Sequence, residues 1–226
     1  MIRDEWISAL QKNCQATFGI TPALSEVMCD QLWAHKELLQ EWNQKMNLTS
    51  VATDEGILYR HVLDSLSAIT CADFNAARSL ADVGTGAGFP GIPLKIIFPH
   101  LRLTLIEATR KKTVFLEEVV KKLGLTDVSV VWNRSENIRN NDKYDIITAR
   151  AVAKLPELIK NTSVLLKIGG KFIVFKQENI EEELISSESV LKTCRISLES
   201  RKIIEIFDGT AMVRRVLLVY KKYQKT

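Results

Sequence analysis

After about residue 78 the sequence alternates short apolar segments with longer amphipathic ones, and this alternation limits the possible folds more than any other feature. The apolar segments predict strands at 79–83, 101–106, 128–132, 144–149 and 171–176. Amphipathic or charged segments predict helices at 109–123, 155–166 and 178–192. Strict alternation of buried strands with helices is typical of a parallel sheet covered on both faces. The sequence therefore predicts an α/β, doubly wound, Rossmann-like sheet.

The two ends of the chain depart from this alternation. The last two apolar segments, 196–206 and 212–220, are joined only by a short link that contains Asp208-Gly209. Asp-Gly favours a tight turn, so these segments predict an antiparallel hairpin at or near one edge of the sheet. Residues 1–75 instead carry apolar side chains at helical spacing, which predicts three or four short helices. We expect an N-terminal helical segment, residues 1–75, packed on a core domain, residues 76–226.

Composition excludes several classes of protein. The chain is 46% hydrophobic and 26% charged, which is typical of a globular chain and excludes a disordered or low-complexity one. No apolar run approaches the length of a membrane helix, and the acidic start at Asp4-Glu5 is unlike a signal peptide. We therefore expect a cytoplasmic protein with no membrane segment. The net charge of +4 permits an anionic partner without requiring one. The cysteines and histidines are scattered, so no metal site is expected, and nothing demands more than a monomer.

The segment most informative about function is a glycine-rich loop, residues 82–91, with the sequence DVGTGAGFPG. It lies between the first strand and the first helix of the α/β region, where doubly wound sheets bind ligands. Its spacing satisfies the dinucleotide pattern G-x-G-x-x-G, which is weak evidence alone. Asp82 favours another ligand, because a carboxylate beside the loop repels a pyrophosphate and attracts an ammonium group. Glu107, at the end of the second strand, is placed to accept hydrogen bonds from a ribose.

Together these features favour S-adenosylmethionine, which carries an ammonium and a sulfonium and no phosphate. Gly86 is expected to contact it from the centre of the loop. Three alternatives remain open. The chain could be an NAD-binding oxidoreductase, or a nucleotide-binding regulator without catalysis. The loop could also be a solvated strand-end turn with two incidental acids.

Several motifs in order resemble the glucose-inhibited division protein B family of class I methyltransferases, which methylate N7 of a guanine in bacterial 16S (small-subunit) ribosomal RNA. The matching motifs are Asn47-Leu48-Thr49, Arg60-His61-x-x-Asp64-Ser65-Leu66, residues 82–94, Lys111-Lys112, Arg134-x-Glu136 and Thr148-Ala149-Arg150-Ala151. The resemblance implies a class I methyltransferase sheet, mostly parallel with a C-terminal antiparallel strand. It also implies S-adenosylmethionine as cofactor and small-subunit ribosomal RNA as partner. A methyltransferase acting on another RNA or on a protein is the alternative.

The resemblance further implies which residues bind. Cofactor contacts are implied at Gly84, Phe89, Glu107, Ala108, Thr109, Ser135, Glu136 and Arg150. Arg150 could meet either the methionine carboxylate of the cofactor or the RNA. Candidate substrate contacts are Arg60, His61 and Lys176. The alternative for Arg60 and His61 is a polar cluster that packs the N-terminal helices onto the sheet.

The sequence around the fourth strand fits an acceptor that needs no base. Guanine N7 has a free lone pair and no proton, so transfer depends on alignment rather than on a general base. The strand is followed by Thr148-Ala149-Arg150-Ala151 and not by the Asn/Asp-Pro-Pro-aromatic cluster used for exocyclic amines. No Pro-Cys pair offers the thiol that ring-carbon methylation requires. We therefore expect no catalytic side chain.

Overall fold

The computed structural model describes residues 1–20, 24–134, 143–150, 153–207 and 210–224. Within these residues seven strands form one sheet in the order β3-β2-β1-β4-β5-β7-β6. The strands are β1 (Ser79–Val83), β2 (Arg102–Glu107), β3 (Val128–Trp132), β4 (Tyr144–Arg150), β5 (Leu166–Lys176), β6 (Ile196–Phe207) and β7 (Met212–Lys222). Strands β1 to β5 pair in parallel, whereas β7 pairs antiparallel with both β5 and β6. The predicted parallel sheet and edge hairpin are confirmed, while the Asp208-Gly209 turn lies outside the described residues.

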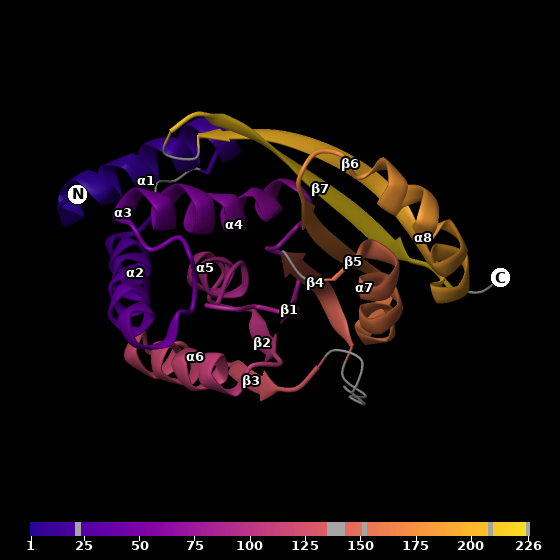
Figure 1. Cartoon of the computed structure of the whole chain (residues 1–226), viewed down its shortest axis with the longest axis horizontal. Coiled ribbons are helices and arrows are strands. Elements are labelled where there is room, and N and C mark those ends of the chain that lie inside the picture. The colour runs from indigo at the N-terminus through magenta and orange to yellow at the C-terminus, as the bar shows by residue number, and fades with distance from the viewer. Residues whose placement is uncertain (21–23, 135–142, 151–152, 208–209, 225–226) are drawn as a thin grey trace.

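Helices cover both faces of this sheet (Figure 1). They are α5 (Gly91–Ile97), α6 (Arg110–Lys122), α7 (Leu155–Thr162), a 3-10 turn η4 (Ser163–Leu165) and α8 (Glu181–Cys194). Because successive side chains of a strand point to opposite faces, each buried strand contributes side chains to two hydrophobic cores, one on each face of the sheet. In β5, Phe172 and Val174 belong to the core under α7 and α8. Ile173 and Phe175 belong to the other core, under α5, α6 and the N-terminal helices.

Strand β5 begins earlier than its sequence suggests. It was expected over 171–176 after a helix over 155–166, but the helix ends at Thr162 and the strand begins at Leu166. A register irregularity opposite Tyr144–Ile146 of β4 accommodates the extra residues. Gly169 adopts a φ of +78° there, a backbone conformation that residues with a Cβ rarely adopt.

The N-terminal region forms two long helices and one composite helix. They are α1 (Arg3–Phe18), α2 (Glu26–Met46), and a continuous run of α3 (Asp54–Gly56), π-helical η1 (Ile57–Leu63), α4 (Asp64–Leu66) and 3-10 η2 (Ser67–Thr70). The expectation of short helices is wrong for α1 and α2, which have 16 and 21 residues. Ser25 caps α2, and no glycine or proline interrupts it before the left-handed Asn47.

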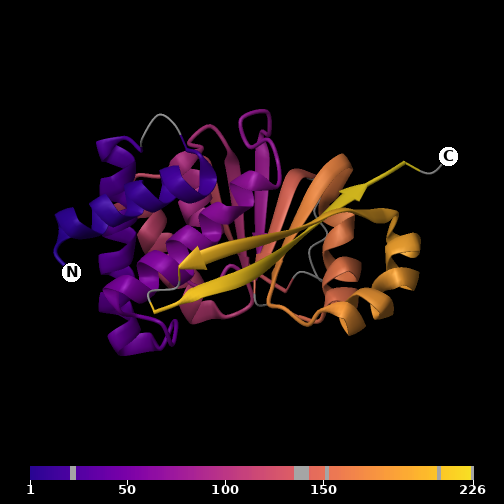
Figure 2. The same ribbon diagram turned by 90° about the horizontal axis from the view of Figure 1, so that it is seen from above.

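These helices share a core with the sheet. Trp6 of α1 and Leu32 of α2 belong to the same buried cluster as Leu103 and Leu105 of β2. Figure 2 shows the β6–β7 hairpin running along the molecule from α7 and α8 toward the N-terminal helices. The boundary at residue 75 stays a prediction. No helix in the described part of the chain is long and apolar enough to cross a membrane.

Asp54 joins the N-terminal elements to one another. Its carboxylate accepts hydrogen bonds from the Met1 ammonium at 3.0 Å and from Gln40 at 3.0 Å. It also forms an ion pair with Lys36 at 2.7 Å, while its backbone carbonyl accepts a hydrogen bond from Trp6. Burial acts to raise the pKa of Asp54, but these donors outweigh it and lower the pKa to about 2.

Replacing this carboxylate tests its contribution. We expect Asp54→Asn to lower the free energy of unfolding at pH 7 by roughly 2 kcal/mol, because the nearly buried Lys36 loses its anionic partner. The wild-type advantage is present above about pH 4 and is lost as the pH falls toward 2, because the unfolded state binds the proton first. Urea unfolding between pH 2 and 7 measures the difference. Asp4→Asn, at an acid whose side chain is 86% exposed, is the control. If the stability difference between wild type and Asp54→Asn does not change with pH, the lowered pKa of Asp54 is wrong.

Candidate functional site

The buried carboxylate of Asp82, in β1, fastens the glycine loop at both ends. Its Oδ2 accepts hydrogen bonds from Thr85 Oγ1 at 2.6 Å and from the backbone N–H of Gly91 at 2.8 Å. Its Oδ1 accepts one from Thr148 Oγ1 of β4 at 2.9 Å. Gly91 is required at this contact, because a Cβ would lie 2.9 Å from the carboxylate and 2.7 Å from Leu105. Asp82 therefore organises the loop from beneath.

This geometry corrects the expected role of Asp82. The sequence argument placed its charge against the ligand, but the residue is 0% exposed and its carboxylate accepts hydrogen bonds from Thr85, Gly91 and Thr148. Strand position alone could not show that the side chain points under the loop. Burial raises the pKa of Asp82 to about 6, although the hydrogen bonds from Thr85, Gly91 and Thr148 act to lower it.

Glu107, at the end of β2, holds the loop from the other side. Its Oε2 accepts the N–H of Gly86 at 3.0 Å and its Oε1 accepts the N–H of Thr109 at 2.8 Å. The N–H groups of Gly88 and Phe89 donate to the carbonyl of Thr85. A dinucleotide-binding loop offers such N–H groups to a pyrophosphate. In this loop, protein acceptors already engage such N–H groups: the Thr85 carbonyl accepts two of them, and the carboxylates of Glu107 and Asp82 accept those of Gly86 and Gly91. The loop therefore favours a ligand without phosphate.

A cavity of about 260 Å³ opens at the carboxyl ends of β1, β2 and β3. We call it the β1–β3 cavity. It is lined by Val83, Gly84, Ile106, Ala108, Asn133, Arg134, Ala153, Glu157, Leu158 and Asn161. Of the expected cofactor contacts, Gly84 and Ala108 line it directly. Glu107, which bonds Gly86 and Thr109, lies in the chain between the lining residues Ile106 and Ala108. Ser135 and Glu136 lie outside the described residues. Sequence reasoning missed Asn133, whose only signal is its place directly after β3.

Phe89 ties the loop to the N-terminal helices. Its ring is 3% exposed and stacks between the imidazoles of His35 and His61, with centroids 4.7 Å away on each side. The Nε2 of His35 lies 2.9 Å from the carbonyl of Ala87. Burial lowers the pKa of His35 to about 4. Burial and the charge of Arg150 lower that of His61 to about 3, so both rings are neutral at physiological pH.

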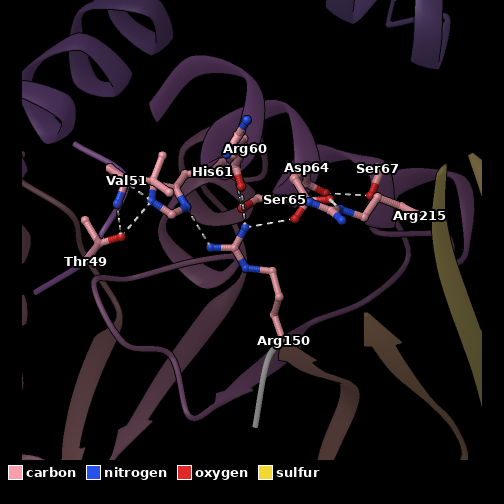
Figure 3. A network of polar contacts seen from close by, with 9 residues as sticks. All are labelled: Thr49, Val51, Arg60, His61, Asp64, Ser65, Ser67, Arg150 and Arg215. Carbon is pink, nitrogen blue, oxygen red and sulfur yellow. Dashed lines mark hydrogen bonds and ion pairs between the residues drawn. The ribbon is translucent and has the colours of Figure 1, made fainter. Parts of the chain in front are cut away.

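Arg150, at the end of β4, reaches into the N-terminal composite helix (Figure 3). Its Nη1 donates to the carbonyl of Arg60 and to Asp64 Oδ2, each at 2.9 Å. Its Nη2 donates to Nδ1 of His61 at 3.2 Å. Because Nδ1 accepts this bond, the imidazole carries its hydrogen on Nε2, which lies 3.1 Å from the Val51 carbonyl.

A second and larger cavity, of about 680 Å³, lies at the ends of β4 and β5. We call it the β4–β5 cavity. Its lining includes Arg60, His61, Asp64, Arg150, Lys176 and Arg215. The structure thus brings the three candidate substrate contacts together with Arg150. Lys176 forms an ion pair with Glu183 at 2.6 Å. Arg215 of β7, far along the chain, also lines this cavity.

The strand order, the antiparallel β7 and the glycine loop define the class I methyltransferase fold. The ribosomal protein L11 methylase of Lactobacillus delbrueckii subsp. bulgaricus superposes with a TM-score of 0.56 and 19% identity, over 73% of this chain and 79% of that one. TYW2 of M. jannaschii, solved in complex with AdoMet, superposes with a TM-score of 0.52 and 18% identity, over 64% and 68%. At these identities the likeness concerns the fold alone.

Sequence similarity defines the family within this class. The family model described as rRNA small subunit methyltransferase G matches residues 28–206. A protein of Acetivibrio thermocellus named ribosomal RNA small subunit methyltransferase G is 42% identical, over 92% of this chain and 86% of its own length. A protein of Staphylococcus carnosus with the same name is 40% identical, over 88% and 85%. The chain belongs to the rRNA small subunit methyltransferase G family, which confirms the resemblance found in its motifs.

The buried charge of Asp82 has a measurable pH signature. Its folded pKa lies above the unfolded value of 3.8, so the folded state binds the proton first. We therefore expect wild-type stability, relative to Asp82→Asn, to fall by about 3 kcal/mol as the pH rises from about 4 to about 6 and to stay level above that. Denaturant unfolding of both proteins at each pH measures this. Thr148→Val, which removes one hydrogen bond to the carboxylate, should extend this loss of stability to higher pH. If the stability difference between wild type and Asp82→Asn stays constant between pH 4 and 6, the carboxylate is not buried as described.

Proposed function

We propose that the protein is an S-adenosylmethionine-dependent methyltransferase that methylates N7 of a guanine in 16S (small-subunit) ribosomal RNA. The observation that carries the proposal is the β1–β3 cavity beside a glycine loop in which the carboxylates of Glu107 and Asp82 accept the N–H groups of Gly86 and Gly91. Such a loop accepts a nucleoside that brings no phosphate. The name of the relatives, ribosomal RNA small subunit methyltransferase G, supports the RNA substrate.

The residues around this cavity suit the parts of the cofactor. Glu107 stands at the strand end from which a carboxylate accepts hydrogen bonds from ribose hydroxyls. Gly84 and Ala108, with no side chain and a small one, let the cofactor approach the backbone. We assign the adenine edge to Ser135 and Glu136, a backbone contact to Phe89, and the methionine carboxylate or the RNA to Arg150. When bound, S-adenosylmethionine supplies a methyl group carried on a sulfonium.

The acceptor side needs groups that position a base rather than remove a proton. Guanine N7 presents a free lone pair, so alignment with the methyl group lowers the barrier. His61 is a poor general base, because Arg150 occupies its Nδ1 and its Nε2 bonds Val51. The carboxylates of Asp64 and Glu183 are held in ion pairs. We assign Arg60, His61 and Lys176 to the RNA side, and we infer a cytoplasmic monomer that uses no metal.

Ligand titration tests the cofactor assignment. We expect S-adenosylhomocysteine to bind and NAD not to bind in calorimetric titration. Glu107→Ala should weaken S-adenosylhomocysteine binding at least about tenfold, because one or two charge-assisted hydrogen bonds to the ribose are lost. Glu117→Ala, at a half-exposed acid of α6, is the control and should bind normally. Preferential binding of NAD would overturn the assignment.

Mapping of N7-methylguanine in ribosomal RNA tests the substrate. In cells lacking this protein we expect one N7-methylguanine of 16S ribosomal RNA to disappear. Expression of the wild type should restore it, whereas the Glu107→Ala variant should restore it poorly. A methylation map that is the same with and without the protein removes the substrate assignment and leaves the fold untouched.

A further inference from the structure

The composite helix changes its hydrogen-bonding register beside the β4–β5 cavity. Over Ile57–Leu63 it is π-helical, an uncommon form that often marks functional sites. In this register the backbone carbonyl of Arg60 accepts a hydrogen bond from the guanidinium of Arg150. The π segment ends at Leu63 and is followed by Asp64, a residue that is 4% exposed. The irregular helix thus turns several acceptors toward one arginine.

Three acceptors of this helix form what we call the arginine socket: Arg60 O, His61 Nδ1 and Asp64 Oδ2. They use three of the five N–H donors of Arg150, so up to two stay available to a ligand. His61 is itself held by the ring of Phe89 and by Val51. The socket therefore fixes the guanidinium before any ligand arrives (Figure 3).

Asp64 also holds a second arginine. Its Oδ1 accepts a hydrogen bond from Nε of Arg215, in β7, at 2.9 Å. The side chains of Arg150 and Arg215 are 16% and 23% exposed, and both line the β4–β5 cavity. The buried carboxylate of Asp64 thus holds the guanidinium groups of Arg150 and Arg215 on the same wall of the β4–β5 cavity. Since two positive charges share one negative charge, the trio keeps a net positive charge.

We propose that Asp64 is a positioning residue that holds Arg150 and Arg215 as a pair, and that this pair binds a backbone phosphate of the RNA beside the target guanosine. The proposal rests on the proposed function and adds the residues that grip the acceptor strand. Guanidinium forks match the geometry of phosphate oxygens. Contacts to phosphate fix the register of a nucleic acid while the base is presented for chemistry.

The neighbour of Arg215 provides a matched control. Arg214 precedes it in β7, and adjacent side chains of a strand point to opposite faces. Arg214 is 59% exposed and pairs with Glu178 and Glu205. Among the described residues, the lining of the β4–β5 cavity includes Arg215 and not Arg214. Replacing either one by glutamine removes the same charge from the same strand.

The first test measures RNA binding at several salt concentrations. The probe is 16S ribosomal RNA transcribed in vitro, with the full-length protein. We expect Arg215→Gln to raise the Kd about tenfold at 0.15 M salt and to reduce the salt slope by about 0.7–0.9, the value for one lost phosphate contact. Arg214→Gln should stay within about twofold of wild type. Equal effects of the two variants overturn the phosphate assignment.

The second test separates positioning from simple electrostatics. Asp64→Asn removes a negative charge from the cavity, so electrostatics alone predicts tighter RNA binding. Loss of positioning predicts the opposite, and we expect a Kd at least about fivefold weaker, with partial recovery in Asp64→Glu. Asp145→Asn, at a carboxylate that bonds Ser79 and Lys167 at the far end of β4, controls for lost stability. Tighter or unchanged RNA binding by a folded Asp64→Asn overturns the positioning role.

The outcomes for the wild type separate the two proposals. If the wild type binds and methylates the RNA but the arginine variants behave alike, only the phosphate site is wrong. If the wild type neither binds nor methylates ribosomal RNA, the proposed function fails and the phosphate site fails with it. Should Asp64→Asn not fold, the comparison of Arg215→Gln with Arg214→Gln decides the phosphate site alone.

Discussion

The carboxylate of Asp82 lies where water does not reach, and the conformation of the glycine loop depends on it. By bonding Thr85, Gly91 and Thr148, it ties the two ends of the glycine loop and the adjacent strand to a single point. The loop then passes close enough to β2 for Glu107 to bond it as well. A charge this deep is costly to bury, but the donors around it offset much of that cost. The result is a loop whose backbone is fixed before a ligand binds.

The glycine loop separates two regions with different tasks. On one side, the ends of β1, β2 and β3 form a small cavity with one cationic and one anionic side chain in its lining, Arg134 and Glu157. On the other side, β4, β5 and β7 form a larger cavity with four cationic side chains in its lining, Arg60, Arg150, Lys176 and Arg215. Phe89 and its two histidines connect the loop to the helices that carry the arginine socket. The N-terminal region thereby supplies one wall of the charged cavity as well as a cover for the sheet.

The sequence predicted what depends on local pattern. Parallel strands buried on both faces read as short apolar runs, so the sheet, the loop and the hairpin were all predictable. The length of α2 was missed, although no glycine or proline interrupts residues 26–46. The direction of Asp82 could not be predicted, since its strand position is compatible with facing either the ligand or the loop. The Phe89 stack and the Asp64–Arg215 bond join residues far apart in the chain, and no local pattern encodes such contacts.

The position of β7 has a consequence for the order of assembly. It follows β6 in the chain yet lies between β5 and β6, so within the described residues β6 pairs in the sheet with β7 alone. Arg215 arrives with this hairpin and meets Asp64 across 151 residues, a contact with a large loop-closure entropy. A nascent chain could therefore complete the glycine loop while Arg215 is still missing from the β4–β5 cavity. Such an incompletely folded chain would carry Asp64 and Arg150 without the second arginine of the proposed phosphate site.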